Sequence, residues 1–198
     1  MERKRNISLL LIILVISLFL SYHIYNYCII NFNNQKVDSY LVEYEIQDNY
    51  HENNIKKVEY QGKSDDYLGV LLIPKLNFKQ GFYNINDQRN DVNQNIEVLK
   101  DSEMPDIKGS SLIIAGHKGE SYLGYFNNLD KLTINDELEI VYQNKKYLYT
   151  IFDIYELARN GKISFRKNVH ENYLVLTTCS KKNNQQLVVV AKLVNNVS

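Results

Sequence analysis

The sequence predicts a mostly β protein: a closed mixed β-barrel of about eight strands with short helices, preceded by one N-terminal transmembrane helix. Two observations predict this fold class. One apolar run near the N-terminus is long enough to cross a bilayer, and from residue 67 the chain breaks into short apolar runs with little helical periodicity between them. At 198 residues the chain has room for one domain and an appendage, so we expect a single core.

The first 30 residues, "MERKRNISLLLIILVISLFLSYHIYNYCII", combine a basic cluster with an apolar run that starts at Ile7 and ends near Tyr27. A run of roughly 20 residues is what a helix needs to cross hydrocarbon. Because the basic residues precede the run, they should stay in the cytoplasm and the rest of the chain should be exported. A cleaved signal peptide is the alternative, but no small-x-small cleavage site follows. We therefore predict a signal-anchor over 1–30, a single pass through the cell membrane with a cytoplasmic N-terminus, and an extracellular domain.

Residues 31–66 are polar and contain few apolar side chains. Four of these recur at steps of three and four residues, the spacing of one face of a helix: Val37, Tyr40, Leu41 and Tyr44. We expect a docking helix there. The rest of the stretch, including "DNYHENNIKK", is predicted to be a solvated spacer between the membrane and the domain.

The segment 67–198 carries the strands of the predicted domain. In "YLGVLLIP" the final proline cannot continue a central strand, so the run ends there. The segment "DELEIVYQNKKYLYTIFDIYEL" is broken at "QNKK", where a hairpin turn fits. The other apolar runs are "SSLIIAGH", "ENYLVLTTC" and "QQLVVVAKLV". About five to eight strands at this spacing favour a closed or nearly closed barrel.

Charge and cysteine content exclude several functions. Lysine plus arginine and aspartate plus glutamate both number 23, so no overall field favours nucleic acid. The two cysteines, Cys28 and Cys179, are too few for a disulfide scaffold and lack the paired spacing of a zinc site. We expect no metal, no cofactor and no nucleic-acid partner, and any role of Cys179 must be its own.

Cys179 stands at the end of the apolar run "LVLTTCS" and before a polar segment. Its position alone leaves two interpretations open, a functional thiol at a sheet edge and a small buried side chain. A nucleophilic cysteine needs a base or an imidazolium beside it. His117, in "LIIAGHKGE", also follows an apolar run, whereas His170 lies in the polar "RKNVHENY". The matched placement of His117 and Cys179 at two strand ends favours them as a pair.

These segments resemble a known family. "LTTCS" is similar to the Thr-Leu-x-Thr-Cys signature of sortases, and "IIAGHKGE" is similar to their histidine segment. "YLGVLLIPKLNF" resembles the opening strand of the sortase domain, and "YFNNLDKLTINDELEIVYQNKKYLYTI" resembles the stretch after the histidine. The resemblance runs from Tyr67 to Leu193, with four segments in the same order behind one signal-anchor.

The resemblance implies a membrane-anchored cysteine transpeptidase of a Gram-positive-type cell envelope. Its partners would be surface proteins with a C-terminal sorting signal similar to Leu-Pro-x-Thr-Gly, and an amine acceptor, either a peptidoglycan precursor or a pilin lysine. Cys179 would form a thioacyl intermediate at the threonine carbonyl, and His117 would act as general acid and base. Thr178 would donate a hydrogen bond in the substrate groove, although it also fits an ordinary strand position. Ala115 and Gly116 match the small residues beside the family histidine.

One position departs from the sortase pattern. Sortases carry an arginine at the start of the strand after the cysteine, where this chain has Gln186. An amide can donate a hydrogen bond to an oxyanion but supplies no charge, which weakens such a contact by ~1 kcal/mol. Arg166, in "GKISFRKN", is the other candidate for this third role, and a solvated surface position is its alternative. Two other functions remain open: a sortase-like hydrolase, and an envelope binding module that has lost catalysis.

Overall fold

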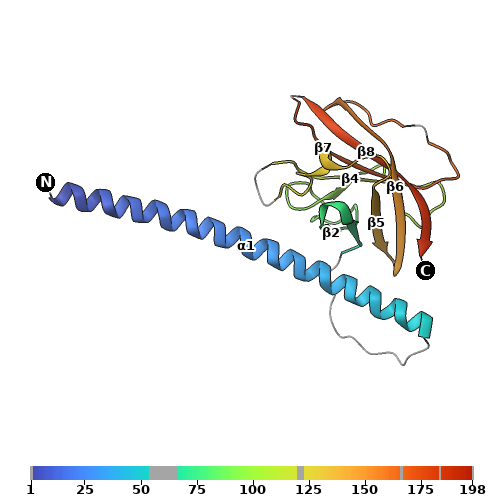
Figure 1. Ribbon diagram of the computed structural model, residues 1–198, viewed down its shortest axis with the longest axis horizontal. Helices are drawn as coiled ribbons and strands as arrows, with labels where there is room; N and C mark the ends of the chain where they lie inside the picture. Colours follow the sequence, from blue (N-terminus) through green and yellow to red (C-terminus); the bar gives the residue numbers. More distant parts are fainter. Residues whose placement is uncertain (1, 54–66, 120–122, 166, 183, 198) are drawn as a thin grey trace.

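The computed structural model describes residues 2–53, 67–119, 123–165, 167–182 and 184–197. One long helix leads into a β-sheet domain, which lies beside the C-terminal half of that helix (Figure 1). The elements in chain order are α1 (Glu2–Asn53), β1 (Gly69–Ile73), η1 (Pro74–Leu76), β2 (Phe78–Phe82), β3 (Glu97–Val98), β4 (Ser111–Ala115), η2 (Leu129–Lys131), β5 (Glu137–Tyr142), β6 (Lys145–Ala158), β7 (Tyr173–Cys179) and β8 (Gln185–Val197).

The strands form one eight-stranded sheet in the order β2-β1-β5-β6-β8-β7-β4-β3. Neighbours are antiparallel except β4 and β7, which are parallel, so the sheet is mixed as predicted. Buried side chains join the edge strand β2 to the segment just before the other edge strand, β3. Gln80 donates to Asn95 at 2.7 Å, and Asn95 donates to the carbonyl of Gly81 at 2.8 Å. The sheet therefore nearly closes into a barrel, which confirms the predicted fold class.

The hairpin between β5 and β6 turns where the sequence predicts it. Tyr142 pairs with Lys145, and the two residues between them, Gln143 and Asn144, have φ of 47° and 57°. Two-residue turns with positive φ at both positions match the right-handed twist of the flanking strands, and asparagine tolerates this conformation well. The first two residues of "QNKK" thus form the turn, and its two lysines begin β6.

Each long strand directs alternate side chains to the interior and to the outside of the barrel. In β7, Leu174 and Leu176 belong to the interior cluster, whereas Val175 belongs to a smaller cluster outside. The connection between β6 and β7 covers this outer cluster, because Ile163 and Phe165 pack against it. The outer face of β7, the strand that ends at Cys179, is therefore partly covered by this connection.

The C-terminal half of α1 packs on the domain with the face that the sequence predicts. Val37 and Tyr44 are buried against domain residues, and Tyr40 and Leu41 lie partly buried beside them. The Tyr40 hydroxyl also donates to the carbonyl of Leu68 at 3.2 Å. The polar segment predicted as a spacer is helical as far as residue 53, and its remainder, 54–66, lies outside the described residues.

Between Leu9 and Leu20, where the structure describes the side chains, α1 has no such packing. Its large apolar side chains between Leu9 and Leu20 are all exposed. Among the residues that the structure describes, α1 is the one helix long and apolar enough to cross a membrane. An exposed apolar helix of this length is typical of a membrane anchor.

Candidate active site

The ends of β4 and β7 bring the predicted histidine and cysteine to one edge of the sheet. The two strands pair in parallel with Ala115 opposite Thr177, and the N–H of Gly116 donates to the Thr177 carbonyl at 3.1 Å. Parallel strands end at the same edge. Cys179 is the last residue of β7, and His117 follows Gly116 just beyond the end of β4. The two residues therefore lie at neighbouring strand ends, and both are partly exposed.

Strand alternation places Cys179 and Gln186 on the outer face of the sheet. Cys179 pairs with Gln186 across β7 and β8, and directly opposed residues share a face. Val175 belongs to the outer cluster, which assigns Cys179 to that face by the two-residue period of the strand. On β4, Ile113 packs against the same cluster, so Ala115, the last residue of the strand, lies on that face, and His117 follows two residues later.

His117 has a polar partner, Asn93, that no sequence pattern indicated. Its Nε2 lies 3.3 Å from Oδ1 of Asn93, and the backbone and side-chain N–H groups of Asn93 both donate to Oδ1 of Asp91 at 2.9 Å. The hydrogen bond from the backbone N–H of Asn93, followed by those from the Asn93 and Gln94 side chains, holds the pKa of Asp91 below its usual range, although desolvation opposes the shift. With its proton on Nε2, the imidazole donates to Asn93, and Nδ1 can accept a proton from a reacting group.

The Gln186 amide is directed toward the connection between β6 and β7. Its Nε2 donates to the carbonyls of Gly161 at 3.1 Å and Ala158 at 3.5 Å, and its Oε1 accepts from the Thr177 hydroxyl at 3.4 Å. These contacts fasten the connection to the start of β8. An oxyanion at Cys179 would have to replace one of the two carbonyls as the acceptor of the Gln186 amide.

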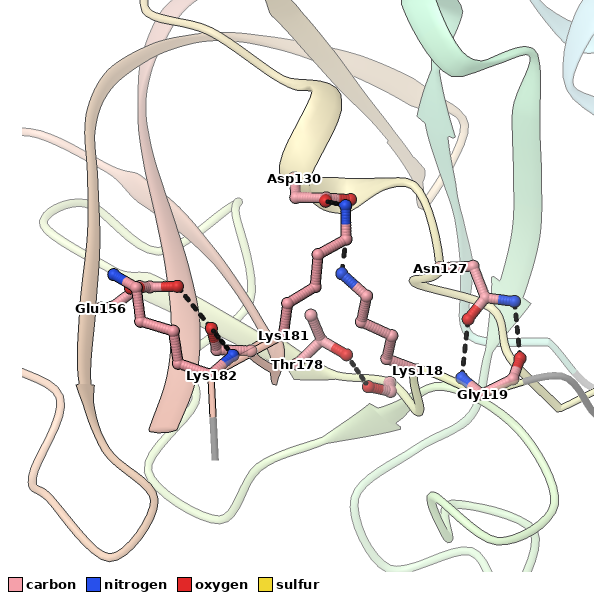
Figure 2. Close-up of polar contacts among 10 residues, drawn as sticks. Lys118, Gly119, Asn127, Asp130, Glu156, Thr178, Lys181 and Lys182 are labelled. Carbon is pink, nitrogen blue, oxygen red and sulfur yellow. Dashed lines mark hydrogen bonds and ion pairs between the residues drawn. The ribbon is translucent and has the colours of Figure 1, made fainter. Parts of the chain in front are cut away.

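Three small or short residues hold the two strand ends close together. Thr178 is buried, and its hydroxyl donates to the Gly116 carbonyl at 2.8 Å (Figure 2). A Cβ atom on Gly116 would lie 2.7 Å from the ring of Phe126. Ala115, the last residue of β4, is partly exposed opposite Thr177. The Thr178 hydroxyl therefore links β7 to β4, and Gly116 allows an aromatic ring to pack directly beneath the histidine segment.

One carboxylate binds lysines from the segments that follow both strand ends (Figure 2). Asp130, in η2, lies 3.3 Å from Nζ of Lys118 and 2.5 Å from Nζ of Lys181. Lys118 directly follows His117, and Lys181 comes two residues after Cys179. Asp130 therefore links the segment after β4 to the segment after β7. Hydrogen bonds from Lys181 and then Lys118 hold the pKa of Asp130 below its usual range, although partial burial opposes the shift.

A second acidic residue anchors the β7–β8 connection to β6. Glu156 pairs with Lys182 and accepts a hydrogen bond from the hydroxyl of Ser180, the residue after Cys179 (Figure 2). The Lys182 hydrogen bond is the main reason why the pKa of Glu156 lies below its usual range. The chain after the cysteine is thus held on two sides, by Asp130 and by Glu156.

The chain after His117 returns to the His117 backbone at Phe126, and we call its described residues, 117–119 and 123–126, the histidine loop. The N–H of Phe126 donates to the His117 carbonyl at 3.0 Å. Next to this bond, Asn127 accepts from the N–H of Gly119 and donates to its carbonyl, both at 2.7 Å (Figure 2). Three hydrogen bonds to backbone atoms therefore hold the two ends of this loop together next to His117.

Two further predictions concern Arg166 and a metal ion. Arg166 lies outside the described residues. Within the described part of the chain, no group of three or more histidine, cysteine, aspartate or glutamate side chains is placed to hold a metal ion.

The chemistry that this edge offers is that of a partly exposed thiol beside an imidazole, with donors and lysines around them. Such a pair can attack a carbonyl carbon and transfer protons to and from the groups that leave and enter.

A family model described as a Sortase domain matches residues 71–194 of the chain. The comparison with curated protein sequences gave no match. Solved structures with a similar fold include the sortase D5 transpeptidase of Clostridium perfringens, with a TM-score of 0.60 and 20% identity over 82% of this chain and 98% of that one.

Sortase C-1 of Actinomyces oris has a TM-score of 0.59 and 18% identity over 78% of this chain and 98% of that one. A lid mutant of sortase A from Corynebacterium diphtheriae has a TM-score of 0.59 and 21% identity over 65% of this chain and 70% of that one. At these identities the likeness is one of fold.

Proposed function

The chain belongs to the sortase family, and on this premise we propose that it is a membrane-anchored transpeptidase with Cys179 as nucleophile and His117 as general acid and base. Its substrates are surface proteins that carry a C-terminal sorting signal similar to Leu-Pro-x-Thr-Gly. Its acceptor is an amine of a peptidoglycan precursor or of a pilin lysine. The catalytic domain is 67–198, joined through 31–66 to the anchor in 1–30.

The proposed reaction has two steps. The Cys179 thiolate attacks the threonine carbonyl, the bond between this carbon and the glycine nitrogen breaks, and His117 gives the leaving amine its proton. The acceptor amine then attacks the thioacyl carbon, the carbon–sulfur bond breaks, and His117 takes the proton of the amine. Cys179 leaves as a thiolate, so the enzyme returns to its starting state. A thioester reacts readily with amines, which suits transfer better than an ester would.

The observation that carries this proposal is the parallel pairing of β4 and β7. It brings the ends of two strands that are far apart in the chain to one edge of the sheet, and His117 and Cys179 each lie two residues beyond the last pair, Ala115 and Thr177. Neighbouring strands lie about 5 Å apart, within reach of an imidazole and a thiol. The contact of His117 with Asn93 supports the role in proton transfer, because it orients the ring.

Cys179→Ala tests the mechanism directly. Full-length protein in detergent is incubated with a sorting-signal peptide, with and without an amine, and the masses of protein and products are measured. Wild type should gain the mass of the thioacyl fragment and yield an amine adduct. Cys179→Ala should do neither, whereas Cys28→Ala, which removes the exposed thiol on α1, should behave as wild type. Transfer product from Cys179→Ala would contradict the mechanism, and free acid alone in the presence of amine would favour a hydrolase.

The oxyanion donor is proposed to be Gln186 or Arg166. Gln186 lies opposite Cys179, and its amide can exchange the Gly161 carbonyl for the oxyanion. Gln186→Ala should then lower kcat/KM without abolishing transfer. An unchanged rate in this variant would leave Arg166 as the candidate.

The occupied amide of Gln186 is also the observation that favours a second function, a binding module with impaired catalysis. In that case Cys179 should be no more reactive than an ordinary thiol. Alkylation of Cys179 at neutral pH, compared with Cys28 in unfolded protein, separates the two proposals. Faster alkylation of Cys179 supports the transpeptidase.

A further inference from the structure

α1 runs without interruption from the membrane-spanning stretch into the stretch that docks on the domain. The helix extends from Glu2 to Asn53, most of its exposed large apolar residues lie between Ile7 and Phe32, and its buried residues Val37 and Tyr44 lie further along. Within this described helix no break separates the two stretches. A continuous helix transmits the direction of its membrane-spanning part to whatever is bound to its other end.

The contacts of α1 with the domain follow a fixed order along the helix. Nearest the apolar stretch, the Asn33 amide donates to the Tyr125 hydroxyl at 3.4 Å. One turn or more further on, Asp38 pairs with Lys79, and the Tyr40 hydroxyl then donates to the Leu68 carbonyl. Tyr125 belongs to the histidine loop. Of these three polar contacts, the one nearest the apolar stretch therefore joins α1 to the loop that begins at the candidate catalytic histidine.

A surface pocket of about 410 Å³ with a mixed polar and apolar lining lies at the same junction. It is lined by Ile30 and two neighbouring asparagines of α1, by the region around Phe78, and by Gly124 and Tyr125 of the histidine loop. Along the helix axis, Asn33 lies about 9 Å beyond Tyr27, at a rise of about 1.5 Å per residue. The headgroup region is about 5–8 Å thick on each side of the bilayer. With the apolar stretch crossing the bilayer along its normal and ending at Tyr27, this junction falls at the outer boundary of the headgroups.

We propose that α1 is a rigid mount that holds the histidine-loop end of the domain against the lipid headgroup layer. The site then works at one height above the membrane and favours substrates presented at the bilayer surface over the same signal in solution. This inference rests on the proposed function. It adds to it a fixed working distance, which depends on the length and stiffness of α1 between the apolar stretch and the first contact with the domain.

The experiment changes that length with and without loss of stiffness. One variant of the full chain receives seven helix-forming residues, Glu-Ala-Ala-Ala-Lys-Ala-Ala, between Cys28 and Ile29, which raises the domain by about 10 Å. The matched variant receives seven residues of glycine and serine at the same point, which form a flexible link. Each protein, in vesicles, is given the sorting signal either as a soluble peptide or anchored in the same bilayer by a short spacer.

Wild type should process both substrates. The helical insertion should lower the ratio of anchored to soluble processing by about tenfold, because the effective concentration of a tethered substrate falls steeply when the site is out of reach. The flexible insertion should lower the ratio much less. A ratio that the helical insertion leaves unchanged would overturn the rigid mount. Absence of soluble processing in wild type would instead contradict the proposed function, so the two failures are distinct.

A measurement without turnover tests the same geometry. A fluorophore is attached at Gly119→Cys, in the histidine loop, or at Val194→Cys, near the opposite end of the domain, with Cys28 and Cys179 replaced by alanine. A Cβ on Gly119 meets no atom within 4 Å, and Val194 is exposed, so both sites accept a label. Headgroup-labelled nitroxide lipids should quench the label at 119 more than the label at 194, and the helical insertion should reduce this difference. Equal quenching at both sites would contradict the proposal.

Discussion

The interior of the barrel and the rim around Cys179 are held together by different contacts. In the interior, side chains such as Leu176 and Ile114 are fully buried in one apolar cluster. At the rim, Asp130 and Glu156 hold the connections through lysines that are largely exposed on the β7–β8 side. A fully buried leucine stabilises a fold by about 1.5–3 kcal/mol, and an exposed ion pair by about 0–1 kcal/mol. The interior therefore carries the stability, while the rim can be adapted for chemistry at little cost to folding.

The largest effect on stability should come from the interior. Leu176→Ala removes a fully buried side chain next to the strand end that carries the cysteine, and should lower the free energy of unfolding by about 2–5 kcal/mol. Urea denaturation of the full chain in detergent measures this. Val194→Ala, at a position 65% exposed, is the matched control and should change it by less than about 0.5 kcal/mol. Equal values for the two variants would contradict the conclusion that the buried interior carries the stability.

Gly116→Ala tests the boundary between the two regions. The new methyl group would lie 2.7 Å from the Phe126 ring, so the ring or the strand must move, and the expected loss is about 1–3 kcal/mol. Combining it with Phe126→Leu in a double-mutant cycle identifies the cause. If the two losses add to within about 0.5 kcal/mol, the ring is not what excludes a side chain at position 116.

Thr178→Val removes the hydroxyl that joins β7 to the Gly116 carbonyl while keeping the shape of the side chain. A single buried hydrogen bond of this kind contributes about 0.5–1.5 kcal/mol. We expect a loss of that size in the free energy of unfolding, together with a lower kcat/KM, because the distance between the two strand ends is less fixed. Thr178→Ser keeps the hydroxyl and should retain most of the activity. A serine variant as slow as the valine variant would show that packing, not the hydrogen bond, is important.

The smallest effect on stability should come from Asp130→Asn. Because its pKa is lowered in the folded protein, the Asp130 carboxylate stabilises the fold above its ordinary pKa of 3.8, and this contribution is lost as the pH falls through the lowered value. At neutral pH the cost should stay under about 1 kcal/mol, since Lys181 is 75% exposed. The difference from wild type should vanish in acid. Transfer should nevertheless slow, and Asp130→Glu should restore it. An unchanged rate would contradict a positioning role for Asp130.

Patterns within short segments predicted the parts of the molecule that obey local rules. Alternation and turn residues gave the barrel and the turn at Gln143 and Asn144, and the three- and four-residue spacing gave the docked face of α1. The strand-end positions of His117 and Cys179 also followed from local sequence. Periodicity works for these elements because their burial repeats with the geometry of the backbone.

The rest of the site depends on pairings between distant segments. Asn93 contacts His117 from a polar loop with no periodicity, and Asp130 contacts two lysines that are far apart in the chain. Nothing in a single segment specifies which carboxylate or amide among many will be the partner. The direction of the Gln186 amide is equally set by carbonyls of another strand and its connection. The role that the sequence suggested for this residue therefore stays a prediction.

The parallel pair at the centre of the site also bears on how the molecule matures. β4 and β7 are roughly sixty residues apart in the chain, and contacts of such long range form late and slowly in folding. Under the proposed function, the Cys179 thiol and the His117 imidazole of a newly made chain therefore stay apart until the intervening β5–β6 hairpin has docked and β4 and β7 have paired. The reactive pair then forms together with the fold and not before it.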